Sequence, residues 1–331
     1  MPGMLLSRGF VAEFGERLAA VAAEANLETD FIYLPDDAKA RLTPAECDRI
    51  EIAYLTRDIR FSALYPGFGD AVTAARNLKW VHFVSTGIDQ HPFLPALIAR
   101  GVRLTTSAGS NGEPVGQTAI CGLLMLARGF PHWMDAQRRH AWEPVRGSAA
   151  PRDLRGQTVA IVGLGTIGAT VARFCQALGM HVIGVRRRPL QPGDPVDEMH
   201  TLATLPAVLP RCDWVVLACP LTDDTRHLLN TETLALLPRG ARVVNVARGG
   251  VVDQQALIDA LKSGHLGGAY LDVFEQEPLP ADSPLWDLPD VVITPHNASA
   301  SAGNDRRAAE IFFTNLARWA RGETLHNERA A

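Results

Sequence analysis

The sequence predicts an α/β protein with two doubly wound parallel sheets, each covered by helices on both faces. Short apolar runs alternate with amphipathic helical patterns along most of the chain, which is typical of parallel sheets buried on both sides. This alternation pauses in a polar, proline-containing passage before residue 151 and then restarts. The length of 331 residues is about what two domains of ordinary size need.

The first hundred residues contain the elements of one such sheet. Their apolar runs are rich in β-branched and aromatic residues, which favour strands. We expect strands at 31–34, 52–56, 80–85 and 102–105, and helical segments at 13–24 and 70–76. A long helix is predicted over 113–128, because a loop-like stretch precedes it and Gly129 and Pro131 follow it.

The second half predicts a complete doubly wound sheet. Six apolar runs alternate there with helices or shorter connections, and the expected strands are 158–162, 181–185, 214–218, 243–246, 269–273 and 291–294. The last segment, 305–321, is predicted to be one helix with Ile311, Leu316 and Trp319 available for packing. Because the second sheet is already complete, we expect this helix to return to the first domain.

Composition excludes several classes of function. The net charge is −4, so no global basic field would hold nucleic acid or an anionic membrane. No apolar stretch is long enough to span a bilayer, and the amino-terminal sequence does not resemble a signal peptide. The five cysteines are scattered without a C-x-x-C pair, so we expect no disulfide framework, no metal site and a cytoplasmic location.

A glycine-rich motif predicts a dinucleotide cradle. The pattern G-x-G-x-x-G follows the strand 158–162 and opens an amphipathic helix, which is the context that this fingerprint requires. Its glycines permit a tight turn, close approach of a pyrophosphate and close packing of the helix on the strand. Helix N-terminal amides then favour the negative phosphates. The motif consists of Gly163, Leu164, Gly165, Thr166, Ile167 and Gly168.

The next strand predicts the choice of cofactor. NAD enzymes place an acidic residue about 20 residues beyond the fingerprint, near the adenosine ribose. Here the strand 181–185 is followed by Arg186, Arg187 and Arg188. Guanidinium groups bind a 2′-phosphate through charge-assisted hydrogen bonds, so NADP(H) is favoured and NAD(H) stays possible. The alternative is a solvated basic loop.

Three later strands end in residues that can carry chemistry. Arg248 follows the strand 243–246, Glu275 and Glu277 follow 269–273, and His296 follows 291–294. In doubly wound sheets the carboxyl ends of the strands face the ligand crevice. We therefore expect an arginine, an acid and a histidine to converge at the nicotinamide end of the cofactor.

These motifs together resemble the D-isomer-specific 2-hydroxyacid dehydrogenase family, which includes glyoxylate and hydroxypyruvate reductases. The chain carries G-x-G-x-x-G, N-x-A-R-G, D-V-F-E-x-E-P-L and T-P-H in order. The resemblance implies that Arg248, Glu277 and His296 are catalytic; Glu277 is chosen over Glu275 because the family's acid directly precedes the proline. It further implies that Thr86 and Gly87 bind the substrate carboxylate together with Arg248. The cofactor contacts that it implies, beyond the glycine motif, are Cys219, Pro220, Leu221, Thr225, Ala247 and Asp272, the last holding the nicotinamide carboxamide.

The chemistry of these side chains agrees with such roles. An arginine can hold a 2-keto acid through its carboxylate and carbonyl oxygens and polarise the carbonyl. A histidine can protonate the developing alkoxide, because imidazole both gives and takes a proton near neutral pH. A neighbouring glutamate orients the imidazole and stabilises its charged form.

Two positions depart from the usual family pattern. The long helix normally opens with V-A-E, whereas this chain has Val115, Gly116 and Gln117. A hydrophobic residue usually follows T-P-H, and here Asn297 does. Neither change touches the three catalytic positions, although the electrostatics around them differ.

The resemblance also implies the domain plan. A Rossmann cofactor domain, residues 106–297, would be inserted in a flavodoxin-like substrate domain of residues 1–105 plus 298–331. The helix 113–128 would belong to the cofactor domain and to the interface of a homodimer.

The expected function is hydride transfer between NADP(H) and a small 2-keto or D-2-hydroxy acid, with glyoxylate or hydroxypyruvate as candidate substrates. Formate oxidation in related folds uses glutamine where Glu277 stands, which argues against it; phosphite oxidation is a further reading. An alternative from another class is a dinucleotide-sensing interaction protein, similar to a corepressor, that uses the same fold as a switch.

Overall fold

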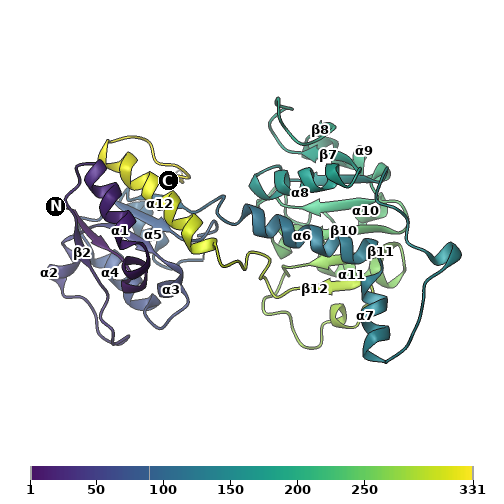
Figure 1. The fold of residues 1–331 in the computed structure, drawn as a ribbon, viewed down its shortest axis with the longest axis horizontal. Helices are drawn as coiled ribbons and strands as arrows, with labels where there is room; N and C mark the ends of the chain where they lie inside the picture. The colour runs from purple at the N-terminus through teal and green to yellow at the C-terminus, as the bar shows by residue number, and fades with distance from the viewer. Residues whose placement is uncertain (1, 89, 330–331) are drawn as a thin grey trace. The chain divides into compact units, whose positions relative to one another are not determined.

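The computed structural model describes residues 2–88 and 90–329. It contains two compact units: residues up to Ser110 together with those from Ala302 form the first, and Asn111–Ser301 form the second (Figure 1). We expected the chain to pass between domains after residues 105 and 297, and it passes a few residues later in both places.

The sheet of the first unit has the strand order β2-β1-β3-β4-β5 and is parallel throughout. This 2-1-3-4-5 order is that of flavodoxin-like folds. The strands are β1 (Gly3–Leu5), β2 (Asp30–Ile32), β3 (Ile50–Leu55), β4 (Trp80–Phe83) and β5 (Arg103–Thr106). The sequence did not predict β1, since three residues give little periodic signal; they form a strand because two neighbours pair with them and all three are buried.

Helices cover both faces of this sheet. They are α1 (Arg8–Glu24), α2 (Pro44–Cys47), α3 (Arg57–Arg60), α4 (Tyr65–Ala74), α5 (Leu94–Ala99) and α12 (Asn304–Ala320). Figure 1 shows the yellow α12 beside the purple α1, and Phe312 of α12 stacks on Tyr54 with ring centroids 4.7 Å apart. The last helix therefore packs in the first unit, as we expected.

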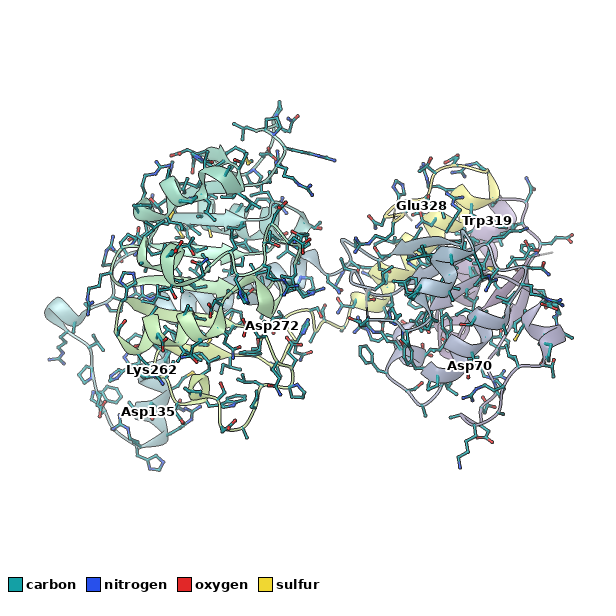
Figure 2. The ribbon with its side chains drawn as sticks, turned by 180° about the vertical axis from the view of Figure 1, so that it is seen from behind. Asp70, Asp135, Lys262, Asp272, Trp319 and Glu328 are labelled. Atoms are coloured by element: carbon teal, nitrogen blue, oxygen red, sulfur yellow. The ribbon has the colours of Figure 1, made fainter. Side chains whose placement is uncertain are left out.

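The segment after α12 extends this sheet. Glu328 forms an antiparallel bridge with Thr105 of β5, and its carboxylate accepts two hydrogen bonds from Arg103, at 2.6 and 2.8 Å. Figure 2 labels Glu328 and Trp319 in this region. These contacts hold the carboxyl-terminal segment along the edge strand.

The second unit contains a seven-stranded parallel sheet in the order β12-β11-β10-β9-β6-β7-β8. Counted from β6, this is the Rossmann order 3-2-1-4-5-6 with one further strand. The strands are β6 (Thr158–Val162), β7 (His181–Val185), β8 (Glu198–His200), β9 (Trp214–Leu217), β10 (Ala241–Asn245), β11 (Leu266–Leu271) and β12 (Val291–Ile293). The predicted fold class is thus confirmed. Strand β8 was not predicted, because it is a polar, half-buried edge strand without an apolar run.

The longer helices of this unit are α6 (Gly112–Ala127), α7 (Phe130–Arg138), α8 (Thr166–Ala177) and α11 (Gln254–Lys262). Short helical turns complete it: α9 (Leu205–Val208), α10 (Thr231–Ala235), η1 (Gly147–Ala149), η2 (Leu202–Thr204), η3 (Leu209–Arg211), η4 (Gly249–Val251) and η5 (Pro284–Trp286).

Helix α6 lies very close to its neighbours because it presents glycines to them. A Cβ atom on Gly116 would lie 2.6 Å from a methyl carbon of Thr170 in α8, and one on Gly122 would lie 2.2 Å from the ring of Tyr270 in β11. Both distances are shorter than carbon atoms tolerate. Gly116 is one of the departures from the family pattern, and here it permits the α6–α8 contact.

Candidate active site

Three adjacent strands of the second unit present the predicted chemical groups. Strands β10, β11 and β12 are parallel neighbours, with Asn245 paired to Leu271 and Leu271 to Ile293. Their carboxyl ends therefore meet at one edge of the sheet. The segments that continue from these ends carry Arg248, Glu277 and His296, respectively.

His296 and Glu277 are directly hydrogen-bonded. The Nδ1 atom of His296 lies 2.7 Å from Oε2 of Glu277, and Oε1 of Glu277 accepts the backbone N–H of Phe274 at 3.0 Å. A carboxylate that accepts this bond assigns the hydrogen to Nδ1 and leaves Nε2 free of it. The His296 side chain is 48% exposed, which leaves room for a substrate to reach it.

The rival acid, Glu275, has different partners. Its Oε1 lies 3.0 Å from Nε2 of His227 and accepts the backbone N–H of Gln254 at 3.3 Å. Among the two acids, only Glu277 is hydrogen-bonded to His296 in the described part of the chain. The geometry therefore agrees with the choice that the family pattern implies.

Arg248 stands on a turn that two neighbours shape. The side chain of buried Asn245 accepts the N–H of Ala247 at 3.0 Å and donates to the carbonyl of Arg248 at 3.2 Å. A Cβ atom on Gly249 would lie 1.9 Å from the Phe274 carbonyl, so only glycine lets this turn approach the loop that leads to Glu277. These contacts explain the motif N-x-A-R-G. The Arg248 side chain is exposed and donates to the carbonyl of Ala247 at 2.7 Å.

Asp272 builds the turn that presents His296. Its carboxylate, in a residue that is 4% exposed, accepts hydrogen bonds from the Thr294 hydroxyl at 2.6 Å and from the N–H groups of Asn297 and Ala298 at 2.8 and 3.0 Å. The backbone carbonyl of Asp272 accepts the His296 N–H at 2.8 Å. Figure 2 labels Asp272 within the second unit. The resemblance implies a contact with the cofactor carboxamide; the structure gives Asp272 a role in positioning His296, which the sequence did not predict.

This turn holds His296 in an unusual backbone conformation. Its φ angle is +50°, in the left-handed region that side-chain-bearing residues seldom adopt. Thr294 is itself fixed, because its hydroxyl also lies 2.6 Å from the hydroxyl of buried Tyr270. The side chain of Asn297 is exposed and only its backbone contributes here, so this departure from the family pattern leaves the turn intact.

The glycine motif has the geometry that a pyrophosphate needs. Gly163 has a φ of +93°, and a Cβ atom there would lie 2.6 Å from the Ala218 carbonyl. A Cβ on Gly168 would lie 1.9 Å from the Gly163 carbonyl, whereas the space over Gly165 is open. Helix α8 begins directly after Gly165. Gly163 thus permits the tight turn, and Gly168 permits close packing of the helix on the strand. Gly165 leaves the space into which phosphates fit.

A second loop continues from β9, the other neighbour of β6. Thr225 closes it: its hydroxyl donates to the Pro220 carbonyl at 2.7 Å and accepts the Thr222 N–H at 2.8 Å. Leu221 lies within 3.2 Å of the Cβ position of Gly250. Cys219 is buried, which raises the pKa of its thiol to about 11. The thiol is therefore not a nucleophile, and the side chain packs in the protein interior.

The three arginines after β7 occupy different environments. The guanidinium of Arg186 forms an ion pair with Asp194 and donates to the carbonyls of Arg188 and Pro189 at 3.1 and 2.8 Å. Arg187 and Arg188 are exposed, and no hydrogen bond or ion pair joins their guanidinium groups to another residue within 2–88 and 90–329. The motif that we predicted as one cationic cluster is thus divided into a braced residue and two available ones.

Thr86 and Gly87 lie in the first unit, in the loop after β4. The Ser85 hydroxyl donates to the Gly87 carbonyl at 2.9 Å, and the guanidinium of Arg329 lies 3.4 Å from the Thr86 carbonyl. Within the described chain, no hydrogen bond uses the backbone N–H of Thr86 or Gly87. Both donors are therefore available to an anion.

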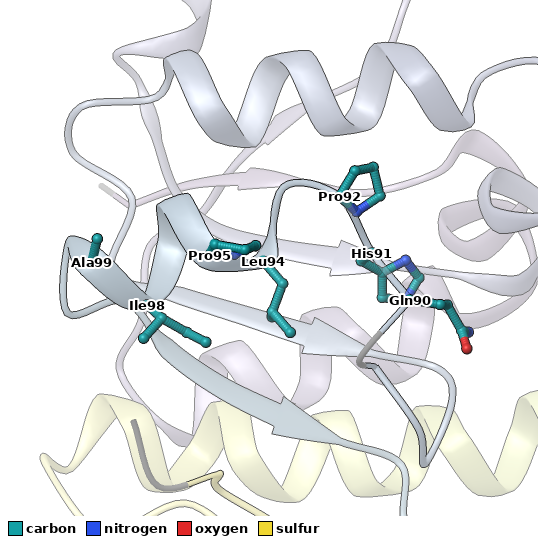
Figure 3. A pocket seen from close by; sticks show the side chains of 7 residues that line it. All are labelled: Gln90, His91, Pro92, Leu94, Pro95, Ile98 and Ala99. Atoms are coloured by element: carbon teal, nitrogen blue, oxygen red, sulfur yellow. The ribbon is translucent and has the colours of Figure 1, made fainter. Parts of the chain in front are cut away.

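A hollow of about 490 Å³ lies farther along the same segment (Figure 3). Apolar side chains dominate its lining, and no carboxylate, lysine or arginine contributes. It is lined by Gln90, His91, Pro92, Leu94, Pro95, Ile98 and Ala99. This lining therefore offers neither an arginine nor a lysine to bind the carboxylate of a small keto acid.

Residues 2–88 and 90–329 contain no group of three or more histidines, cysteines, aspartates or glutamates placed to hold a metal ion. Nor does any helix among them combine the length and the apolar character that crossing a bilayer demands.

Comparison with known proteins identifies the family. The family model described as "D-isomer specific 2-hydroxyacid dehydrogenase, NAD binding domain" matches residues 120–298. The chain belongs to the D-isomer specific 2-hydroxyacid dehydrogenase family. It is therefore related to NAD(P)-dependent oxidoreductases that act on 2-hydroxy acids, and the resemblance inferred from its motifs is confirmed.

Individual members of this family match over most of their length. A glyoxylate reductase of Korarchaeum cryptofilum is 37% identical over 77% of this chain and 76% of its own. An (S)-sulfolactate dehydrogenase of Chromohalobacter salexigens is 32% identical over 95% of this chain and 98% of its own length. A solved family member from Xanthobacter autotrophicus Py2, in complex with NADPH and MES, is 33% identical to this chain. The match covers 99% of this chain and 97% of that one, with a TM-score of 0.74.

The role of Asp272 yields a prediction. In Asp272→Asn an amide NH₂ replaces one of two accepting oxygens, so a donor faces backbone N–H donors around the His296 turn. We expect a loss of about 1–3 kcal/mol in the free energy of unfolding, the cost of unpaired buried groups. Because the turn presents His296, kcat should also fall.

Urea unfolding and steady-state kinetics measure both effects. Asp253→Asn is a matched control, since that carboxylate also accepts a backbone N–H, from Ala256 at 3.0 Å, but at a helix start away from the His296 turn. Wild-type stability and kcat in Asp272→Asn would show that the carboxylate does not maintain the turn.

Proposed function

We propose that this enzyme uses NADPH to reduce a small 2-keto acid, of the size of glyoxylate or hydroxypyruvate, to a D-2-hydroxy acid. The observation that carries the proposal is the 2.7 Å hydrogen bond between His296 and Glu277, at the strand end beside the one that carries Arg248. Carbonyl reduction needs an oriented imidazole for its proton and a guanidinium for its developing charge, and His296 and Arg248 follow strands at the same edge of the sheet.

The residues around β6 would hold the cofactor. The open space over Gly165 and the start of α8 suit its pyrophosphate, with Cys219 to Leu221, Thr225 and Ala247 beside it. When bound, the reduced nicotinamide supplies the hydride. The chain's own residues bind the keto acid, polarise it and provide the proton.

Each of these steps has a candidate residue. The free N–H groups of Thr86 and Gly87 would bind the substrate carboxylate, and Arg248 would bind its carboxylate and carbonyl oxygens. As hydride adds to the carbonyl carbon, the C=O π electrons move to oxygen, and that oxygen takes the proton from Nε2 of His296. The ring is left neutral and takes a proton from solvent before another turnover, while Glu277 keeps it oriented through the hydrogen bond at Nδ1.

Arg187 and Arg188 support the cofactor preference. Both are exposed on the loop that follows β7, and β7 pairs with β6, whose end carries the glycine motif. Two uncompensated guanidinium groups favour a ribose that carries a 2′-phosphate. The related Xanthobacter structure contains NADPH, which agrees with this preference.

The proposed reaction is tested by initial rates for glyoxylate and hydroxypyruvate with each cofactor. We expect turnover with both acids and a higher kcat/KM for NADPH than for NADH. Arg187→Ala should lower kcat/KM for NADPH while leaving that for NADH nearly unchanged, because only the 2′-phosphate loses a partner. A preference for NADH would contradict the cofactor assignment. Saturable NADPH binding without turnover of any 2-keto acid would instead favour a dinucleotide-sensing protein.

Substitution of Glu277 and of His296 tests the proton donor. Glu277→Gln keeps a side chain that can hydrogen-bond Nδ1 of His296 but removes its charge, so kcat should fall by less than it does in His296→Ala. His296→Ala should lower kcat by about a hundredfold or more.

Glu275→Gln is the matched control for this variant. Its carboxylate is paired with His227 rather than His296, so its kcat should equal that of the wild type. A wild-type kcat in Glu277→Gln would mean that Glu277 does not position the proton donor.

We further propose that the enzyme is a homodimer formed through the α6–α7 region. Large apolar side chains are exposed there, among them Phe130, Trp133, Met134 and Trp142, the last at 93%. Such a concentration is typical of a covered surface. We expect sedimentation to give twice the 35.8 kDa chain mass, and Trp133→Glu to shift the equilibrium toward monomer. Sedimentation of the wild type as a monomer at micromolar concentration would refute the dimer.

A further inference from the structure

Arg186, the first of the three arginines, uses most of its donors within its own loop. Its Nη1 donates to Oδ1 of Asp194 at 2.9 Å, its Nη2 donates to the other carboxylate oxygen and to the Pro189 carbonyl, and its Nε donates to the Arg188 carbonyl. The two side chains are only 18% and 14% exposed. Four of the five N–H groups that a guanidinium owns are thereby engaged.

Asp194 is equally committed to this loop. It accepts the N–H of Gln191 at 2.7 Å, and its own N–H donates to the Gln191 carbonyl at 3.1 Å. The hydrogen bond from Arg186, followed by that from Gln191, lowers the pKa of Asp194 below its ordinary value. The carboxylate is therefore ionised at neutral pH and cancels the charge of Arg186.

Backbone hydrogen bonds of Arg186 and Asp194 close the loop at both ends. The N–H of Arg186 donates to the His200 carbonyl at 2.9 Å, and Val196 donates to the Asp194 carbonyl at 2.9 Å. Residues 186–194 thus form a closed loop between β7 and β8, with the exposed Arg187 and Arg188 on it.

We propose that Asp194 is a positioning residue for recognition of the 2′-phosphate: it holds Arg186 as the brace of the loop, so that Arg187 and Arg188 are the phosphate ligands. This inference rests on the proposed preference for NADPH. A loop formed before the ligand arrives binds more tightly, because the ordering cost is already met. The brace also explains why a third arginine adjoins the phosphate ligands without being one.

Equilibrium binding of 2′,5′-ADP and 5′-ADP to the full-length chain tests the proposal without turnover. Calorimetry on wild type should show tighter binding of 2′,5′-ADP. In Asp194→Asn, the affinity for 2′,5′-ADP should fall by about three- to tenfold, as for residues coupled through one network, while that for 5′-ADP changes less than about twofold. Asp135→Asn, which removes the same charge from exposed α7, should match the wild type.

The sign of the change separates this proposal from direct binding by Arg186. If Arg186 were the ligand and Asp194 its competitor, Asp194→Asn would release the guanidinium and 2′,5′-ADP would bind more tightly. That result, or additive effects of Arg186→Ala and Asp194→Asn in a double-mutant cycle, would overturn the proposal. We expect the double variant to bind like either single one.

Two further measurements keep the test decisive. Asp194→Glu retains the charge and should bind 2′,5′-ADP more tightly than Asp194→Asn but less tightly than the wild type. If Asp194→Asn does not fold, a loss of affinity in Asp194→Glu relative to the wild type still tests the proposal. Arg187→Ala and Arg188→Ala should each reduce the salt dependence of binding. Equal wild-type affinities for the two nucleotides would refute the NADPH preference itself, whereas a preference in Asp194→Asn as large as that of the wild type would refute only the role of Asp194.

Discussion

The carboxylate of Asp272 is the group on which the candidate active site depends. It lies almost fully buried at the end of β11 and accepts hydrogen bonds from Thr294, Asn297 and Ala298. These three residues follow β12 and surround His296, so one buried acid joins two strand ends. Polar groups buried in this way are stable only when all their partners are present, which ties the orientation of His296 to the integrity of the sheet.

Carboxylates serve three separate purposes in this second unit. Asp272 shapes a backbone turn, Glu277 contacts the imidazole and Asp194 neutralises a guanidinium. The division arises from what each acid meets: backbone donors, a titratable ring or a fixed cation. Sequence proximity does not sort them, since Glu275 and Glu277 are two residues apart and hold different histidines.

Much of this organisation could be predicted from the sequence, because it depends on local pattern. The apolar runs predicted ten of the twelve strands; the three-residue β1 and the polar edge strand β8 were missed, because neither contains an apolar run long enough to show a pattern. The glycine motif and the three strand ends were located by their context. The partners of Arg186 could not be predicted, because they depend on how the irregular loop 186–194 closes. The role of Asp272 could not be predicted either, because it depends on where the ends of β11 and β12 meet in the folded chain.

The backbone at His296 has a consequence for the balance between stability and activity. A left-handed φ of +50° suits glycine or asparagine better than histidine, so the fold carries a local strain of roughly 1 kcal/mol or more at His296. Glycine would relieve this strain and keep the turn, since it is the backbone N–H of His296 that bonds the Asp272 carbonyl. Under the proposed function, a homologous sequence with glycine at this position would therefore keep the fold and lose the proton donor.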